Sequence, residues 1–148
     1  REPTARVTRL HFAEGTPYET ELVRRPARGE QVFAPDVARV LKREMRGVVE
    51  QGTAIGAKGA LGPLPIGGKT GTGDNRIERY SAPGVLAESK ATNRTATFVF
   101  TVGDRYYGTV VAAVLGAEAE GQRFTSALPV TVFKQLAPKI RAVVDPAN

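Results

Sequence analysis

Hydrophobic spacing predicts one amphipathic helix in the first third of the chain. Between residues 35 and 50, apolar residues recur at helical spacing, and basic residues occupy the opposite face. Pro35 stands where the first turn of a helix accepts proline, and Gly47 or Gly52 weakens or ends the helix. The apolar positions are Val37, Val40, Leu41, Met45, Val48 and Val49.

Alternation of apolar and polar residues predicts a β-hairpin before this helix. Residues 7–12 alternate and lead into a turn signal at residues 14–17. We therefore expect a peripheral β segment over residues 1–33. His11 lies in its first run, where we read it as an ordinary strand residue.

Three strands are predicted after the helix. Residues 52–68 are dense in Gly and Pro and are expected to form a loop, which enters a strand at residues 66–72. A second loop is expected from Gly73 to about Thr92. Two further strands, at residues 95–102 and 106–115, follow as antiparallel partners around a turn at residues 103–105.

The last elements complete an α+β pattern. The near-continuous apolar run of residues 106–115 suggests a strand covered on both faces. Residues 124–144 repeat apolar positions at helical spacing and predict a final helix, kinked or broken at Pro138, that packs back on an antiparallel sheet. Residues 34–148 are thus expected to form one unit, following the peripheral β segment.

Composition narrows the function classes. The chain has 148 residues, 41% of them hydrophobic, and no run is long and apolar enough to span a bilayer. The absence of cysteine and the single histidine exclude disulfides, cysteine-ligated zinc and most Ser-His-Asp arrangements. No cofactor or metal site is expected. The net charge of +6 leaves two alternatives open, a solvated surface or a polyanion-binding surface, and the interspersed acidic residues favour the first.

The strongest chemical signal is the run Lys69-Thr70-Gly71-Thr72, preceded by two glycines. A phosphate-binding P-loop would need glycine at position 63, where the chain has Pro63, and a helix after Thr70, where glycine follows. Lys-Thr-Gly is instead one of three motifs that serine β-lactamases and penicillin-binding proteins share. On a strand, a cation beside hydroxyls suits a carboxylate, and a backbone N–H suits a developing oxyanion.

The surroundings of this motif extend the likeness. Residues 47–54, the glycine-rich loop and motif that follow, the strands at 97–104 and from Tyr107, and residues 124–129 resemble the transpeptidase domain of bifunctional (class A) penicillin-binding proteins. The resemblance covers about residues 33–140 and implies the C-terminal part of a penicillin-binding transpeptidase or serine β-lactamase-like fold.

The resemblance also implies roles for individual residues. Lys69 would neighbour the serine nucleophile and the substrate carboxylate. Thr70 and Thr72 would place hydroxyls on that carboxylate, the Thr72 backbone N–H would contribute to the oxyanion hole, and Gly71 would leave room for the substrate.

Two of the three family motifs are absent. Ser81, Ser89 and Ser126 are the only serines, and none is followed by lysine at the third position or by asparagine at the second. In the family both motifs precede Lys-Thr-Gly, so we expect them in polypeptide upstream of Arg1, with any glycosyltransferase domain and membrane anchor. This chain alone is then expected to be inactive.

The resemblance implies a parent that is a peptidoglycan D,D-transpeptidase working through a serine acyl-enzyme. Its partners would be peptidoglycan stem peptides, β-lactams and the upstream segment, with no nucleic acid and with membrane contact only through an N-terminal anchor. Its location would be periplasmic, or the extracytoplasmic face of a bacterial inner membrane. The alternatives are a D,D-carboxypeptidase or β-lactamase relative, and a non-enzymatic module that binds polyanions.

Overall fold

The computed structural model describes residue 7, residues 9–23 and residues 31–145. The sequence expectations for residues 1–6, 8, 24–30 and 146–148 lie outside these described residues. The chain divides into two compact units, residues 1–38 and 39–148.

The first unit contains the predicted β-hairpin. Strand β1 (Arg9–Phe12) pairs antiparallel with β2 (Thr20–Val23), and both strands are exposed. The connection includes Ala13 and Gly15 with positive φ values of 54° and 74°. His11 makes a local contact only, because its Nε2 lies 2.6 Å from the carboxylate of Glu19.

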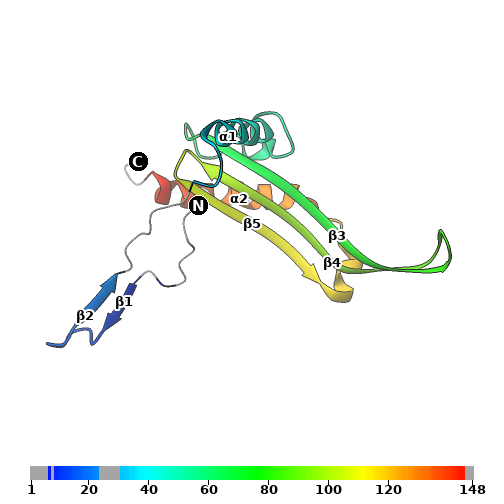
Figure 1. Cartoon of the computed structure of the whole chain (residues 1–148), viewed down its shortest axis with the longest axis horizontal. Coiled ribbons are helices and arrows are strands. Elements are labelled where there is room, and N and C mark those ends of the chain that lie inside the picture. Colours follow the sequence, from blue (N-terminus) through cyan, green and yellow to red (C-terminus); the bar gives the residue numbers. More distant parts are fainter. Residues whose placement is uncertain (1–6, 8, 24–30, 146–148) are drawn as a thin grey trace. The chain divides into compact units, whose positions relative to one another are not determined.

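A three-stranded antiparallel sheet organises the second unit, in the order β3-β4-β5 (Figure 1). Its elements follow the predicted order of helix, three strands and helix, so the α+β class is confirmed. In chain order they are α1 (Pro35–Glu50), which begins in the first unit, the 3-10 turn η1 (Ile55–Ala57), β3 (Ile66–Ala82), β4 (Val85–Val102), β5 (Tyr106–Leu115), the 3-10 turn η2 (Gly116–Gly121) and α2 (Ala127–Val144).

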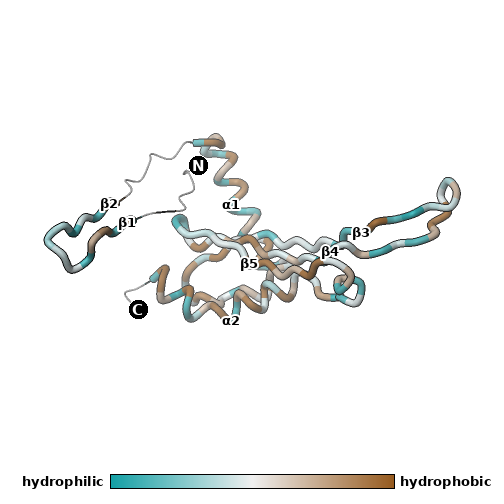
Figure 2. Tube along the Cα trace, turned by 90° about the horizontal axis from the view of Figure 1, so that it is seen from below, coloured by the Kyte–Doolittle hydropathy of each residue, from teal (hydrophilic) through white to brown (hydrophobic). Residues whose placement is uncertain are grey.

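The loop predicted between Gly73 and about Thr92 is wrong. These residues continue β3 and β4 as a two-stranded hairpin that extends past Asn93, where β5 ends its pairing with β4 (Figures 1 and 2). We call residues 74–93 the arm. Gly73, Asp74 and Asn75 favour turns as isolated residues. Cross-strand pairing overrides that preference, and the chain reverses only at Gly84, with φ of 78°.

Two further expectations need correction. Strand β5 is not covered on both faces, because its residues alternate between half-buried and exposed. Helix α2 is not broken at Pro138 but continues to Val144. Proline removes one helical hydrogen bond. Packing of Phe133 and Ala137 before it, and of Ile140 after it, holds both halves of α2 against the same core.

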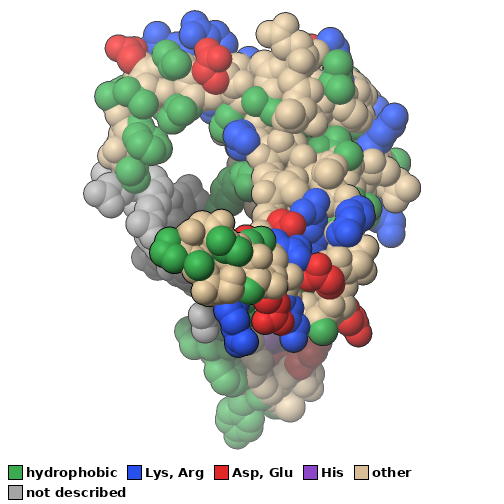
Figure 3. Space-filling model, turned by 90° about the vertical axis from the view of Figure 1, so that its right-hand side faces the viewer, with side chains coloured by type: hydrophobic (Ala, Val, Ile, Leu, Met, Phe, Trp, Pro, Cys, Tyr) green, Lys and Arg blue, Asp and Glu red, His purple; other side chains and the backbone are tan. Residues whose placement is uncertain are grey.

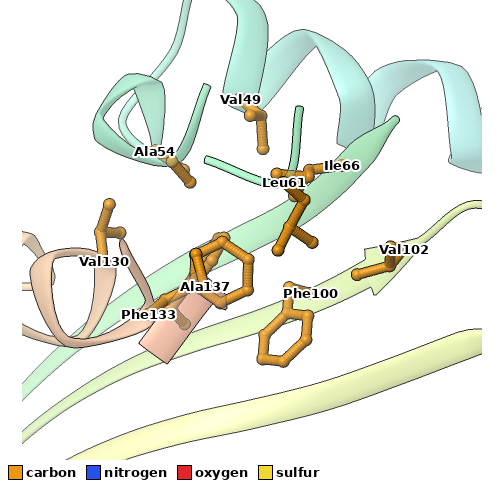
Figure 4. Packing of buried hydrophobic residues seen from close by; sticks show 11 residues of the cluster. Val49, Ala54, Leu61, Ile66, Phe100, Val102, Val130, Phe133 and Ala137 are labelled. Carbon is orange, nitrogen blue, oxygen red and sulfur yellow. The ribbon is translucent and has the colours of Figure 1, made fainter. Parts of the chain in front are cut away.

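Aromatic packing between the sheet and α2 forms the centre of the core (Figure 4). Phe98 and Phe133 are fully buried, and their ring centroids lie 5.3 Å apart in an edge-to-face arrangement. Phe100 lies 4.6 Å from Phe133. Such ring pairs stabilise a core beyond the area that they bury. The smaller buried residues around them include Val49, Leu61 and Val130.

Two adjacent glycines of β3 let neighbouring elements approach closely. A Cβ built on Gly67 would lie 3.3 Å from the Met45 Cβ of α1. A Cβ on Gly68 would lie 2.4 Å from the Phe98 ring, on the opposite face. Gly67 therefore sets the contact with α1, and Gly68 makes room for the aromatic core. An ion pair of 2.6 Å between Lys42 and Asp104 links α1 to the β4–β5 turn, and this hydrogen bond lowers the pKa of Asp104.

The close approach at Gly68 gives a stability test. Gly68→Ala should lower the free energy of unfolding by about 1–3 kcal/mol, because the new methyl group clashes with the Phe98 ring and with the Val99 backbone. Gly47→Ala is the matched control, since nothing lies within 4 Å of its Cβ position. That change should stabilise α1 by about 0.5–1 kcal/mol. Urea unfolding of both variants measures the two effects, and equal effects would contradict this account of Gly68.

Candidate functional site

The Lys69-Thr70-Gly71-Thr72 motif lies on β3, an outer strand of the sheet. Within the described part of the chain, β3 pairs only with β4, through partners that run from Ile66↔Val102 to Ala82↔Val85. Its other backbone edge has no strand beside it in this sheet. Unpaired N–H and C=O groups on such an edge are a template for an added extended chain.

Strand alternation sends the motif's side chains to two faces. Lys69 pairs with Val99, which is 43% exposed, whereas Thr70 pairs with the fully buried Phe98. Lys69 and Gly71 therefore belong to the open face of the sheet. Thr70 and Thr72 belong to the face that α2 covers.

Both motif threonines bond to loops that flank β3. The Thr70 side chain is 7% exposed, and its hydroxyl lies 2.6 Å from the hydroxyl of Thr53. The Thr72 hydroxyl accepts a hydrogen bond of 3.0 Å from the backbone N–H of Ser126. Because Thr72 accepts this bond, its own O–H proton remains available for donation.

Lys69 is an exposed cation without a carboxylate partner among the described residues. Its Nζ donates a hydrogen bond of 2.6 Å to the backbone carbonyl of Thr70. It forms no ion pair with any residue that the structure describes. An exposed ammonium group that bonds only to a neutral carbonyl can exchange that partner for an anion at little cost.

The surface beside Lys69 is flat because three glycines of β3 face three threonines of β4. A Cβ on Gly71 would lie 2.7 Å from the hydroxyl oxygen of Thr97. The same crowding occurs at two neighbouring pairs, Gly67 with Thr101 and Gly73 with Thr95. A side chain at these glycines would force the facing threonine hydroxyl to move, and glycine keeps this surface flat.

An ionic network fixes the base of the arm. Arg76 donates to Glu120 at 2.6 Å and lies 3.6 Å from Asp74. Asp74 also lies 3.5 Å from Arg94, which donates two hydrogen bonds to the Phe124 carbonyl. Charges of both signs alternate over this side of the molecule (Figure 3). The network ties the first residues after the motif to η2 and to the segment before α2.

Beyond the end of β5, the Glu120 carboxylate bonds to β4 and to β3. One of its carboxylate oxygens accepts a 2.7 Å hydrogen bond from the buried Ala91 N–H, and the other accepts from Arg76. These two bonds, the first above all, hold the pKa of Glu120 below its usual range. A lowered folded-state pKa means that the bonds contribute stability above the ordinary carboxylate range and lose it as pH falls through the lowered value.

The sequence did not reveal most of these partners. Thr53, Ser126 and Glu120 lie 17, 54 and 44 residues from the motif or arm residues that they bond. Asp74 and Arg76 looked like a turn, yet they lie on a strand. The available sequence signal was a charged residue at every second position after the motif, which indicates a strand because a half-exposed strand places its charges on one face.

Comparisons with known proteins assign nothing to the chain. No protein-family model matches it, and no curated protein matches it. None of the helices in the described residues is long and apolar enough to cross a membrane. No cluster of metal-ligating side chains occurs among those residues either.

The Glu120 contacts give a second prediction. Replacing Glu120 with Gln removes the charge that both bonds rely on, so the Ala91 amide should exchange its hydrogen several-fold faster near neutral pH. Glu118→Gln, in the same 3-10 turn, is the control and should leave that rate unchanged. In the wild type, the Ala91 amide resonance should shift only as pH falls through the lowered Glu120 pKa. Hydrogen exchange and amide shifts followed by NMR measure both effects, and equal rates in the two variants would contradict the role of Glu120.

Proposed function

We propose that this chain is the C-terminal part of a peptidoglycan D,D-transpeptidase that works through a serine acyl-enzyme. In this proposal β3 is the wall of the active site that binds the substrate carboxylate and carbonyl. The nucleophile and its general base belong to polypeptide that this chain does not contain. The observation that carries the proposal is the position of Lys69-Thr70-Gly71-Thr72 on the free edge of an antiparallel sheet.

The free edge supports the proposal because an extended peptide needs main-chain partners. A D-Ala-D-Ala stem peptide lying antiparallel to β3 would hydrogen-bond to its unpaired backbone groups. In that position the Thr72 N–H is a donor for the scissile carbonyl oxygen, whose negative charge grows during attack. A sheet edge also holds such a donor rigidly, so no reorganisation is needed in the transition state.

Lys69 supports the proposal through its charge and accessibility. Its ammonium group is exposed and bonds only to the Thr70 carbonyl, which leaves it available to a substrate carboxylate and to a neighbouring serine. The Thr72 hydroxyl is a second donor for that carboxylate, since it accepts from Ser126 and keeps its own proton free. The Thr70 hydroxyl, paired with Thr53, would contribute by orienting the strand and the carboxylate contacts beside it.

Covalent labelling with a fluorescent penicillin tests the proposal. The intact encoded protein should be acylated, and Lys69→Ala should slow its acylation by at least about a hundredfold, as removal of an electrostatic stabiliser does. This isolated chain should not be acylated at all. Lys90→Ala removes an equal charge from an exposed arm position and should leave the labelling rate unchanged.

Two outcomes would reject the proposal: covalent labelling of the isolated chain, or an encoding reading frame without a Ser-x-x-Lys segment upstream of Arg1. Salt-sensitive binding of the chain to polyanions that Lys69→Ala does not change would favour the polyanion-binding alternative. Among enzymes, transfer of the acyl group to water instead of an amine would assign a D,D-carboxypeptidase or β-lactamase relative.

A further inference from the structure

The segment between η2 and α2 reaches the Lys69 strand at Thr72. Residues 122–125 have no regular secondary structure, and Ser126 directly precedes α2. The backbone N–H of Ser126 donates to the Thr72 hydroxyl at 3.0 Å. The direction of this bond is fixed, because a backbone N–H can only donate. The position of the Ser126 N–H therefore decides which lone pair of the Thr72 oxygen is occupied.

Arg94 fixes this segment to the sheet two residues before Ser126. Its Nε and Nη2 both donate to the carbonyl oxygen of Phe124, at 3.0 and 2.8 Å. Its third nitrogen, Nη1, lies 3.5 Å from the Asp74 carboxylate, and the side chain is only 15% exposed. The guanidinium also lies 6.0 Å from the centre of the Phe124 ring, within reach of a cation–π contact. A planar group that places two donors on one carbonyl holds it in a defined position.

The two cations near the motif, Arg94 and Lys69, therefore differ in what they can do. Arg94 pairs with Asp74, two residues after Thr72, so all three side chains share the covered face of the sheet. Every guanidinium nitrogen of Arg94 faces a partner there. The Lys69 ammonium is exposed on the open face and bonds to one neutral carbonyl. Lys69 is thus available to an anion, whereas Arg94 acts on the site through the segment that it holds.

The Thr72 hydroxyl is the last group in this series of contacts. Thr72 is exposed, and none of the described residues accepts a hydrogen bond from its hydroxyl. Because one lone pair of its oxygen already accepts the Ser126 N–H, the O–H proton is restricted to the remaining directions. A donor that is oriented before a ligand arrives needs no reorganisation when the ligand binds.

We propose that Arg94 is a positioning residue for recognition of the substrate carboxylate. By holding the Phe124 carbonyl, it places the Ser126 N–H. This N–H orients the Thr72 hydroxyl, so that the hydroxyl proton points to the carboxylate of the acyl donor. The inference rests on the proposed transpeptidase function, and it assigns Arg94 no contact with the substrate. Loss of Arg94 then weakens the same interaction that loss of the Thr72 hydroxyl removes.

Hydrogen exchange of this chain tests the contacts without any activity. Arg94→Lys should make the Ser126 amide exchange several-fold faster, because a lysine ammonium cannot place two donors on the Phe124 carbonyl in the fixed geometry of arginine. Thr72→Val removes the acceptor and should have the same effect. Arg123→Lys is the matched control, since Arg123 donates to carbonyls of its own loop and to no strand residue that the structure describes. It should leave the rate unchanged.

Acylation of the intact encoded protein by a fluorescent penicillin tests the role in recognition. Thr72→Val should slow acylation by about tenfold, as loss of a hydrogen bond to a charged group does. Arg94→Lys should slow it several-fold. The double variant should be no slower than Thr72→Val alone, because both changes act through one hydroxyl. A merely structural role of Arg94 would instead multiply the two effects.

The outcomes separate this inference from the proposed function. A Ser126 amide that keeps its wild-type exchange rate in Arg94→Lys would overturn the positioning role. So would unchanged acylation of Arg94→Lys, or a double variant that is slower by the product of the two single effects, and either result leaves the transpeptidase assignment standing. A wild-type protein that penicillin does not label would reject the transpeptidase proposal and, with it, the role of Arg94 in carboxylate recognition.

Discussion

The contact between the Phe98 ring and the bare backbone of Gly68 is the constraint on which the rest of the second unit depends. It lets an aromatic cluster sit directly on the sheet, beneath α2, without separating β3 from β4. Interiors are packed too densely for that ring to move aside, so the register of the two strands is fixed at this point. Since side chains alternate strictly along a strand, this register also decides that Lys69 lies on the open face and Thr70 on the covered one.

In this arrangement the two faces of the sheet contribute different parts of the candidate site. On the covered face, Thr70 and Thr72 bond to Thr53 and Ser126, which anchors the strand to loops on either side. On the open face, Lys69 lies beside the glycines of β3 and the threonines of β4 that face them. If the strand edge binds substrate as we propose, its backbone is held in place from the covered face, which is the preorganisation that carboxylate and oxyanion recognition require.

The sequence predicted those parts of the fold that local patterns determine. Helix α1, the start of the strand that carries Lys69, the turn at Gly103 and strand β5 follow from local patterns, and each lies where it was predicted, although the Lys69 strand continues past Thr72 to Ala82. The arm was missed because Gly73 and Asp74 are turn residues by propensity, and only pairing between distant residues makes them a strand. The Glu120 contacts were inaccessible for the same reason, since they join residues far apart in the chain. For the site, residue types indicated a carboxylate-binding strand, while the partners of its hydroxyls required the fold.

The narrowing of the sheet from three strands to two at Asn93 has a mechanical consequence. The first half of the arm and the Lys69 motif both belong to β3, so a load applied near Gly84 would travel along the β3 backbone towards the motif. The Arg76–Glu120 bond and the Ala91 N–H bond to Glu120 would carry part of that load into η2. We therefore expect the arm to bend about this polar cross-link, while the strand edge beside Lys69 keeps its position.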